Sequence, residues 1–392
     1  MAGKPFCQNG QDTEQAAQSG LGARAMAYGR LPLPADLNWL WVVGAVLCAV
    51  LALMVLTGLS LTLAYTPDAT LAFGSVEGIE RRLPAGWLLR AMHMTGASFF
   101  MLALYIHLLR GLYYRSYQPP RMGVWISGCV LLVMAMVTAF AGYVLPWGQM
   151  SYWGADVAGK AVGALPLIGG WLEGVFLGGD TPGTPTLHRM FALHFGLAFL
   201  IMAMVVGHIT AVHARGSSSP SGRPITQTGA LPFHPYFTVR DMLATVLVAL
   251  GFVAVLCFWP DIIVESANYR PANPLHTPAD IEPEWYFLPF YGMMQAVPFK
   301  LGGLLLSGGA VAVLFAVPWL DRAAGSLRPV PTMVKAGALF LLVVSAVATA
   351  CAGLHHMQGG WLLVARLGMV GYYAYFVLYL PFCSRWQQGK TA

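Results

Sequence analysis

The chain has 392 residues, of which 57% are hydrophobic and only 10% are charged. Soluble domains carry about 25% charged residues, so this composition excludes an ordinary soluble protein and predicts a membrane protein. The formal net charge is +6, but the basic residues gather in loops between apolar segments, which is a topology signal and gives no indication of nucleic-acid binding. The six cysteines form no CxxC pair, so a sulfur-ligated metal site is not indicated.

Eight apolar segments follow one another along the chain, and each is close to the ~20 residues that span a bilayer. An even number of spans puts both termini on one side, where Lys and Arg outnumber Asp and Glu in the loops. The positive-inside rule makes that side cytoplasmic. The sequence therefore predicts an all-α, multi-pass membrane protein with eight transmembrane helices, near residues 41–63, 88–109, 123–145, 190–212, 242–260, 301–320, 333–352 and 361–382.

Two of these segments each carry a pair of histidines fourteen residues apart, His93 with His107 and His194 with His208. Fourteen helical residues rise roughly 21 Å and return to within about 40° of the starting face. An ionisable side chain in a bilayer is costly and usually functional, and two axial imidazoles suit a haem that transfers electrons. The first four helices are therefore predicted to form a bundle around two stacked haems, with His93 and His194 on one iron and His107 and His208 on the other.

The first and third segments repeat this spacing with glycines, which would let a flat porphyrin approach the backbone: Gly44 and Gly58, and Gly128 and Gly142. For a single glycine, close helix packing is the better explanation. Arg90 and Arg110 each lie three residues from a histidine of the second segment, where they could pair with haem propionates. For Arg110, a role as a cytoplasmic anchor is an equally good explanation.

The organisation along the chain follows from these features. We predict a cytoplasmic N-terminal lead over residues 1–36, a dihaem four-helix bundle over 37–215, a cytoplasmic loop over 216–241 and a C-terminal four-helix region over 242–392. Two outer loops, near 147–189 and 261–300, are longer than ordinary connections. Loops of that length usually carry function.

A series of motifs in fixed order resembles a known family. The series includes WLLRAMHMTGASFFMLALYIHLLRGLYYRSY, GYVLPWGQMSYWGA, FALHF, PFHPYFTVRD, NYRPANPLHTP and PEWYFLPFYGMM. From about residue 37 to the last helix, the chain is similar to the cytochrome b subunit of the bacterial cytochrome bc1 complex, a ubiquinol–cytochrome c reductase.

The resemblance implies a redox enzyme that acts within a complex. Such a subunit holds two non-covalent b haems, oxidises ubiquinol near the outer face and reduces ubiquinone near the inner face, and thereby contributes to the proton gradient. The implied location is the bacterial inner membrane, in a respiratory or photosynthetic chain. The implied partners are a Rieske 2Fe–2S protein, cytochrome c1 and a second copy of the complex.

For the outer quinol site, the resemblance points to Glu284 of the PEWY motif, Tyr291 and Tyr143. Quinol oxidation releases two protons, so a base is needed there. Outside that motif, a solvated loop charge would be the better explanation of Glu284.

For the inner quinone site, His213 and Asp241 are the candidate proton donors, and Ser217 is a weaker candidate contact. Asp241 could instead be a helix N-terminal charge. The other histidines of loops and interfaces are His234, His276, His355 and His356. Two other functions stay open at this point: a haem b membrane anchor of another quinone-linked dehydrogenase, and a transporter with structural histidines.

Overall fold

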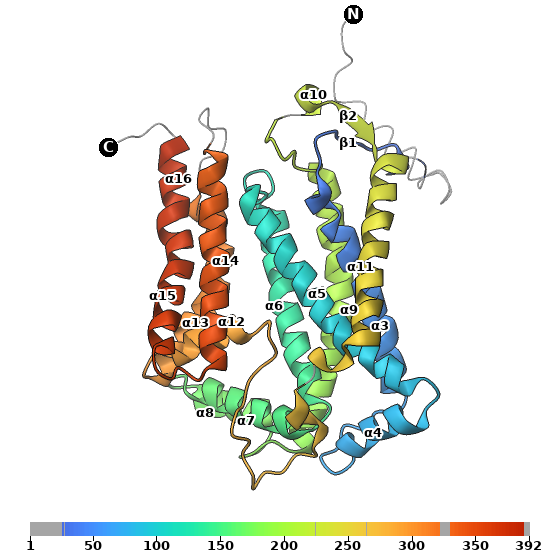
Figure 1. Ribbon diagram of the computed structural model, residues 1–392, viewed down its shortest axis with the longest axis vertical. Coiled ribbons are helices and arrows are strands. Elements are labelled where there is room, and N and C mark those ends of the chain that lie inside the picture. Colours follow the sequence, from blue (N-terminus) through green and yellow to red (C-terminus); the bar gives the residue numbers. More distant parts are fainter. Residues whose placement is uncertain (1–25, 27, 224, 264, 322–329, 388–392) are drawn as a thin grey trace, which may run out of the picture. The chain divides into compact units, whose positions relative to one another are not determined.

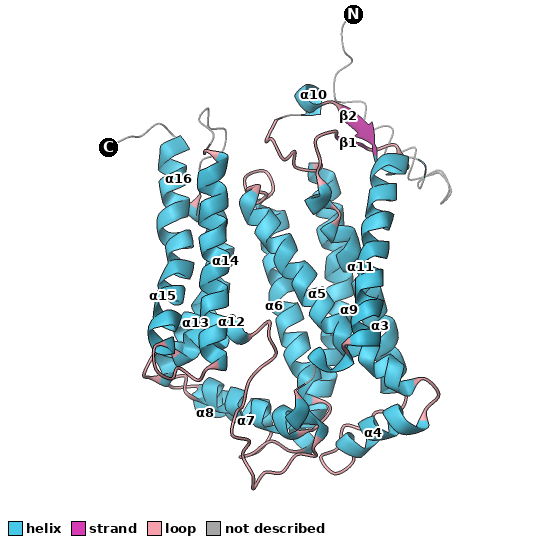
Figure 2. Cartoon of the chain, in the orientation of Figure 1, coloured by secondary structure: helices cyan, strands magenta, loops and turns pink. Residues whose placement is uncertain are grey.

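The computed structural model describes residues 26, 28–223, 225–263, 265–321 and 330–387 (Figure 1). Most of the predicted lead, residues 1–36, lies outside this range. The described part is almost entirely helical (Figure 2) and contains eight helices long and apolar enough to cross a membrane. This confirms the predicted all-α membrane fold. The spans are Trp39–Thr62, Gly86–Tyr113, Met122–Val144, Thr184–Ala214, Phe233–Phe258, Lys300–Leu320, Thr332–Leu354 and Trp361–Trp386.

The chain divides into two compact units. One comprises Met1–Ala49 with Gly216–Gly251, and the other comprises Val50–Arg215 with Phe252–Ala392. Helices α3 (Val43–Thr62) and α11 (Thr238–Phe258) each begin in the first unit and continue into the second.

In the first unit, a small sheet and the hydrogen bonds of one carboxylate connect the segment before α3 to the segment after α9 (Thr184–Arg215). Strand β1 (Pro32–Pro34) pairs antiparallel with β2 (Ala230–Pro232), which is magenta in Figure 2. The carboxylate of Asp36 accepts hydrogen bonds from the hydroxyls of Ser219 at 2.6 Å and Ser221 at 2.7 Å. The described residues of the segment 216–241, which was predicted to be a loop, thus contain secondary structure: β2, α10 (Ile225–Thr228) and η3 (Phe233–Phe237). The short helix η2 (Trp39–Trp41) lies just before α3.

The first half of the second unit contains the histidine-bearing helices. They are α5 (Gly86–Tyr113) and α9 (Thr184–Arg215), and α6 (Met122–Val144) packs along α9. Three shorter helices lie at one end of this unit, called the α7 end below (Figure 1). These are α4 (Ala72–Arg82), α7 (Gln149–Gly163) and α8 (Gly169–Leu177). The long loop at 147–189 is therefore largely helical.

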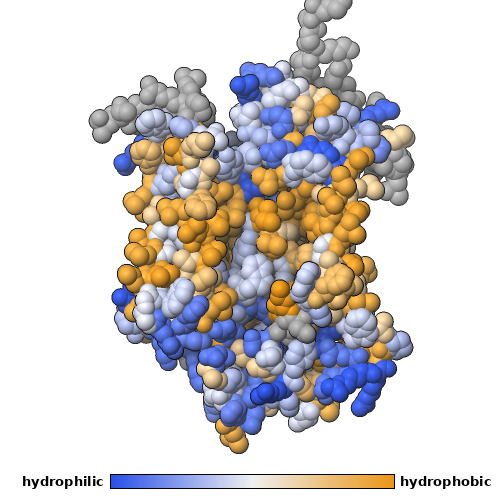
Figure 3. All heavy atoms as spheres, viewed as in Figure 1, coloured by the Kyte–Doolittle hydropathy of each residue, from blue (hydrophilic) through white to orange (hydrophobic). Residues whose placement is uncertain are grey.

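The second half of this unit contains α12 (Leu288–Gln295), α13 (Lys300–Leu320), α14 (Thr332–Leu354), α15 (Trp361–Ala374), η6 (Tyr375–Tyr379) and α16 (Leu380–Gln387), preceded by η4 (Pro260–Ile262) and η5 (Ser266–Tyr269). Helix α14 packs against both α12 and α15. Over α14 to α16, hydrophobic side chains cover the middle of the surface and hydrophilic ones gather toward the α7 end (Figure 3). This is the surface that a lipid bilayer requires.

A buried ion pair joins the two halves at the opposite end. Asp321, which follows α13, is 1% exposed and accepts hydrogen bonds from Arg115 and from the Tyr117 hydroxyl, the latter at 2.7 Å. A buried carboxylate is tolerated only when it is paired in this way. The turn between α5 and α6 is thereby fixed to the end of α13.

Candidate functional site

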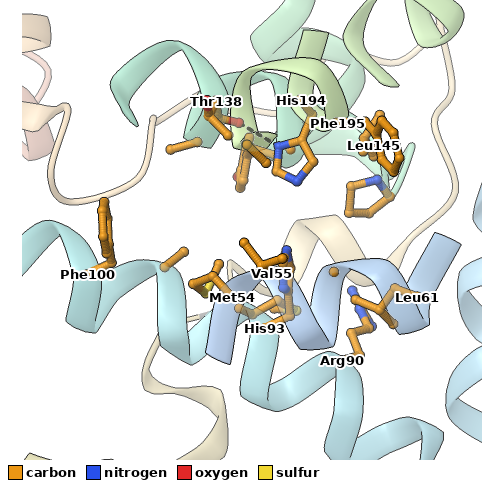
Figure 4. Close-up of a pocket in the computed structure, with 18 of the residues that line it drawn as sticks. Met54, Val55, Leu61, Arg90, His93, Phe100, Thr138, Leu145, His194 and Phe195 are labelled. Carbon is orange, nitrogen blue, oxygen red and sulfur yellow. Dashed lines mark hydrogen bonds between the residues drawn. The ribbon is translucent and has the colours of Figure 1, made fainter. Parts of the chain in front are cut away.

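A cavity of about 260 Å³ in the second unit is lined by α3, α5, α6 and α9 and by the segment that follows α11. Figure 4 shows His93 of α5 and His194 of α9 directed into it from opposite sides. Their ring centroids are 6.1 Å apart. Two imidazoles on opposite faces of one metal ion, each bonded at about 2 Å, hold their ring centres roughly 6 Å apart. The spacing therefore fits one iron between these two rings.

Hydrogen bonds at Nδ1 orient the rings and leave Nε2 free to ligate. Nδ1 of His194 lies 2.7 Å from the carbonyl oxygen of Thr138, which can only accept, so the proton sits on Nδ1. The Thr57 hydroxyl lies 2.9 Å from Nδ1 of His93 and donates its own proton to the Leu53 carbonyl, so it too accepts from the imidazole. A metal-ligating histidine typically donates its other N–H in this way.

The second pair lies fourteen residues further along the same two helices. Ser127 accepts from Nδ1 of His208 at 2.7 Å, because its hydroxyl proton goes to the Val124 carbonyl. Nδ1 of His107 is buried and has no hydrogen-bond partner among the described residues. Arg110 is half-buried one turn beyond His107, near the end of α5.

The glycines contact the imidazoles more directly than the sequence suggested. A Cβ atom on Gly58 would lie 3.0 Å from Cε1 of His93, and one on Gly142 would lie 2.5 Å from Cε1 of His194. On Gly128 it would lie 3.4 Å from Cε1 of His208. Both Gly58 and Gly142 also line the cavity. These positions therefore make room for the histidine rings as well as for a flat ligand. Gly44 lies in the first turn of α3, in the first unit.

Arg90 lines the cavity but already has a carboxylate partner. Its buried guanidinium forms an ion pair with Glu80 of α4 and lies 5.6 Å from the ring centroid of Tyr269. A propionate at this position would have to share the guanidinium with Glu80. The sequence offered no sign of this competition.

Glu284 and Tyr143 line the same cavity as the His93–His194 pair. Burial raises the pKa of Glu284 to about 7, and the nearby carboxylate of Glu265 contributes to the rise. A carboxyl group with that pKa can both accept and release a proton near neutral pH. The cavity thus combines a proton acceptor with two imidazoles whose spacing fits one metal ion.

The PEWY segment is fixed to α5 immediately after Glu284. The indole N–H of Trp285 donates to the Ser98 hydroxyl at 3.1 Å, and the Tyr105 hydroxyl donates to the Tyr286 carbonyl at 2.6 Å. Tyr291, by contrast, does not line the cavity. Its hydroxyl donates to the Ile281 carbonyl at 2.9 Å and so holds the segment that leads to Glu284.

The two long loops pack on each other at the α7 end. The amide N–H of Gln149 donates to the Arg270 carbonyl at 3.0 Å, and that of Ala272 donates to the Trp147 carbonyl at 3.1 Å. The Asn268 side chain accepts from the Ser151 amide at 3.0 Å. This docking brings Ile263, Glu265 and Asn268 of the second loop to the cavity wall.

The three candidate residues of the inner quinone site belong to different units of the chain. His213 is exposed near the end of α9, in the second unit, and its Nδ1 lies 2.8 Å from the Ile209 carbonyl of its own helix. Asp241 is half-buried in the first turn of α11, and Ser217 is half-buried just after α9, both in the first unit.

Sequence reasoning missed Thr57, Ser127, Thr138 and Glu265. A signal was available for two of them, since Thr57 and Ser127 directly precede Gly58 and Gly128 in the sequence. Thr138 acts through its backbone, so its residue type gave no signal. Glu265 joins the cavity only because the two loops dock.

The comparisons with known proteins agree with this geometry. A family model described as Cytochrome b/b6/petB matches residues 29–216, and one described as Cytochrome b(C-terminal)/b6/petD matches residues 271–373. The chain belongs to the cytochrome b family. It is 40% identical to cytochrome b of Rickettsia prowazekii over 91% of this chain and 89% of that protein. It is 41% identical to cytochrome b of Rhodobacter capsulatus over 90% of this chain and 86% of that protein.

A solved structure of a hyperthermophilic respiratory Complex III matches this cytochrome b with a TM-score of 0.85 and 28% identity, over 94% of this chain and 98% of that one. The resemblance seen in the sequence is thereby confirmed. The chain is a haem-binding, multi-pass membrane subunit of a bacterial respiratory complex and functions in quinol–cytochrome c reduction, together with other subunits. The alternatives of a dehydrogenase anchor and a transporter are excluded by matches that cover both halves of the chain.

Proposed function

We propose that this cytochrome b holds two non-covalent b haems, one between His93 and His194 and the other between His107 and His208. The 6.1 Å separation of the first two rings supports this assignment. The Nδ1 hydrogen bonds of His93, His194 and His208, which leave Nε2 available, support it further. Bound there, the haems supply one-electron transfer across the membrane. Arg90 and Arg110 provide positive charge for the propionates, and Gly44, Gly58, Gly128 and Gly142 provide room.

Ubiquinol is oxidised in the cavity beside His93 and His194, with Glu284 as the proton acceptor. The observation that carries this proposal is that the Glu284 carboxyl group shares one cavity with the two imidazoles. A hydroxyl group of the quinol can donate its proton to the Glu284 carboxylate. A haem held by His93 and His194 would supply an acceptor for one electron, and the Rieske protein would accept the other. Tyr143 lines the cavity and contacts the quinol, whereas Tyr291 acts by holding the loop that carries Glu284.

Ubiquinone is reduced at the other side of the membrane, and the residues proposed to take part are His213, Asp241 and Ser217. Reduction consumes two protons, and an imidazole with a carboxylate can deliver them. The half-buried carboxyl group of Asp241 and the exposed imidazole of His213 suit transfer from the aqueous phase. The Ser217 hydroxyl provides a hydrogen bond to the quinone ring oxygen.

The α7 end faces outward from the bacterial inner membrane, and both termini are cytoplasmic. The excess of Lys and Arg in the loops on the side of the termini supports this orientation. A Rieske 2Fe–2S protein and cytochrome c1 accept the electrons, and the complex is a homodimer. One match supports cytochrome c1 as a partner. A longer Bradyrhizobium diazoefficiens protein is named cytochrome b/c1, and this chain is 40% identical to it over 93% of this chain and 53% of that protein.

The test uses the whole complex and one substitution at each quinone site. Glu284→Gln keeps the shape of the side chain and removes the base, so quinol oxidation should slow, by ~10² to 10⁴-fold at most. The b haems should still be reduced from the inner site. Asp241→Asn should leave reduction through the outer site intact and slow reoxidation by quinone. Stopped-flow traces of the b-haem band distinguish the two phases.

Glu77→Gln is the matched control, because that side chain is 44% exposed on α4 and, within the described part of the chain, its ion pair is with Arg81 of its own helix. It should leave both phases unchanged. The assignment of the two sites is wrong if both substitutions slow the same phase, or if Glu284→Gln oxidises quinol at the normal rate.

A further inference from the structure

A second cluster of titratable groups lies at the α7 end, outside the cavity. The turn between α14 and α15 carries His356, whose Nε2 lies 2.9 Å from a carboxylate oxygen of Asp280 and 3.5 Å from one of Glu282. These two carboxylates precede Glu284 by four and two residues. One imidazole thus bridges two acidic side chains of the segment that leads to the proposed catalytic base. We call His356, Asp280 and Glu282 the acidic clasp.

The backbone of the turn is shaped to present this imidazole. His356 and Met357 have φ values of 48° and 58°, in the left-handed region that residues with a side chain seldom adopt. Two consecutive residues of this kind persist only where surrounding contacts over-determine them. The end of α14 that leads into the turn is packed on α12, since a Cβ on Gly353 would lie 3.4 Å from the Tyr291 ring. The imidazole is therefore held against the loop by the fold.

The segment around Glu284 is anchored differently on its two sides. After Glu284, the anchors are the neutral hydrogen bonds of Trp285 and Tyr286 to α5, which do not titrate near neutral pH. Before Glu284, the ionisable anchor is the acidic clasp, next to the neutral hydrogen bond from Tyr291 to Ile281. Pro283 connects the clasp to Glu284. Proline has a fixed φ and restricts the backbone of the residue before it, so a movement of Glu282 is passed on to Glu284.

We propose that His356 is a positioning residue for Glu284, and that it binds Asp280 and Glu282 more strongly when the solution at the α7 end becomes acidic. The proposal rests on the function proposed above for Glu284. A neutral imidazole donates one hydrogen bond from Nε2, whereas a protonated one adds attraction to both carboxylates. The clasped arrangement is the one in which Glu284 lines the cavity, so protonation of His356 favours the productive position.

The groups that face the clasp support a stronger contact between His356 and the carboxylates at acidic pH. Burial raises the pKa of Glu282, and the imidazole of His356 opposes that rise, as expected of a cation that favours the ionised carboxylate. His355 is stacked on Trp361 with ring centroids 4.0 Å apart, and its Nδ1 lies 2.8 Å from the Cys351 carbonyl. The other titratable groups near the clasp are Glu265 and Tyr291.

The test compares rates of quinol oxidation by the whole complex at about pH 8 and about pH 6, the range in which imidazoles gain a proton. His356→Gln keeps a hydrogen-bond donor but cannot become charged. It should match the unmodified protein at pH 8 and fall about two- to fivefold behind it at pH 6, the range expected for a partly exposed ion pair. At each pH, the rate of His356→Gln is divided by the rate of the unmodified protein. This ratio removes the effect of Glu284 titration, which is common to both proteins.

Three further variants make the outcome decisive. His356→Arg carries a permanent charge and should remove the difference at pH 6, whereas His355→Gln should follow the unmodified protein at both pH values. Glu282→Gln removes one of the two negative charges that face His356 and should reproduce the effect of His356→Gln. This variant tests the proposal even if the histidine variant fails to assemble. A constant ratio in His356→Gln, or no rescue by His356→Arg, overturns the proposal. Normal quinol oxidation in Glu284→Gln would instead overturn the proposed function itself.

Discussion

The Thr57 hydroxyl accepts a hydrogen bond from Nδ1 of His93 at 2.9 Å, and Ser127 does the same for His208 at 2.7 Å. In each case the hydroxyl proton is donated to a carbonyl of its own helix, so the acceptor role toward the imidazole is fixed. Each of these two imidazole rings is thereby oriented by a hydroxyl group on a neighbouring helix. Such outer contacts set both the ring orientation and the basicity of the ligand.

Thr57→Val keeps the volume of this side chain and removes the acceptor. We expect haem affinity at the His93–His194 site to fall about 10- to 100-fold, the usual effect of losing such a partner. The midpoint potential of one b-haem component should shift while the other stays unchanged. A redox titration of the α band measures both. Ser60→Ala, which removes an exposed hydroxyl from the same helix, is the control and should change neither.

Gly142→Ala introduces a Cβ atom 2.5 Å from Cε1 of His194. Overpacking of this kind typically costs about 1 to 3 kcal/mol, so the ring must shift and the haem spectrum should change or be lost. Gly196→Ala lies on α9 itself, where an added Cβ has nothing within 4 Å. It should leave the spectrum intact. Identical spectra for the two variants would show that Gly142 serves only helix packing.

The pH dependence of quinol oxidation should reflect Glu284. Because burial raises the pKa of Glu284 to about 7, the carboxylate that acts as base is depleted below that pH and present above it. The rate should therefore increase as the pH rises through about 7. Glu284→Gln should abolish this increase. Glu265→Gln removes the second cause of the raised pKa, so it should move the midpoint of the profile to lower pH; a midpoint that stays or rises would contradict this.

Removing the buried carboxylate of Asp321, which lies at the end opposite the α7 end, should lower thermal stability and leave the haem spectrum unchanged. Asp321→Ala removes the buried carboxylate that pairs with Arg115, and breaking a buried ion pair from one side costs about 3 to 5 kcal/mol. We expect thermal unfolding at a lower temperature with a normal b-haem spectrum below it. Asp180→Ala, at an exposed loop position, is the control for the loss of a carboxylate. Equal thermal stability of both variants would contradict the structural role of Asp321.

The sequence was most informative where one helix fixes the geometry. The fourteen-residue spacing of His93 and His107 follows from helical pitch alone, and the eight apolar segments follow from the thickness of the bilayer. The surface helices α4, α7, α8 and α12 were not predicted as helices, because they are short and lie outside the long apolar runs on which the prediction was based.

The sequence was least informative where separate segments meet. The contact of Ser127 with His208 depends on the rotation of α6 against α9, which no spacing within either helix determines. Glu265 reaches the cavity because Asn268 binds the Ser151 amide, 117 residues away in the chain. His356 meets Asp280 through the packing of α14 on α12. The contact of Gly142 with the His194 ring was not predicted for the same reason, and its contact with a porphyrin stays a prediction.

The central claim is that two histidine pairs each hold one haem, and the most direct test is the haem content of the purified complex. Pyridine haemochrome analysis, expressed per cytochrome b chain, should give two b haems. His194→Ala should give one, with the remaining component retaining the spectrum assigned to His107 and His208. A single haem in the unmodified protein, or two haems in His194→Ala, would contradict the assignment of the ligands.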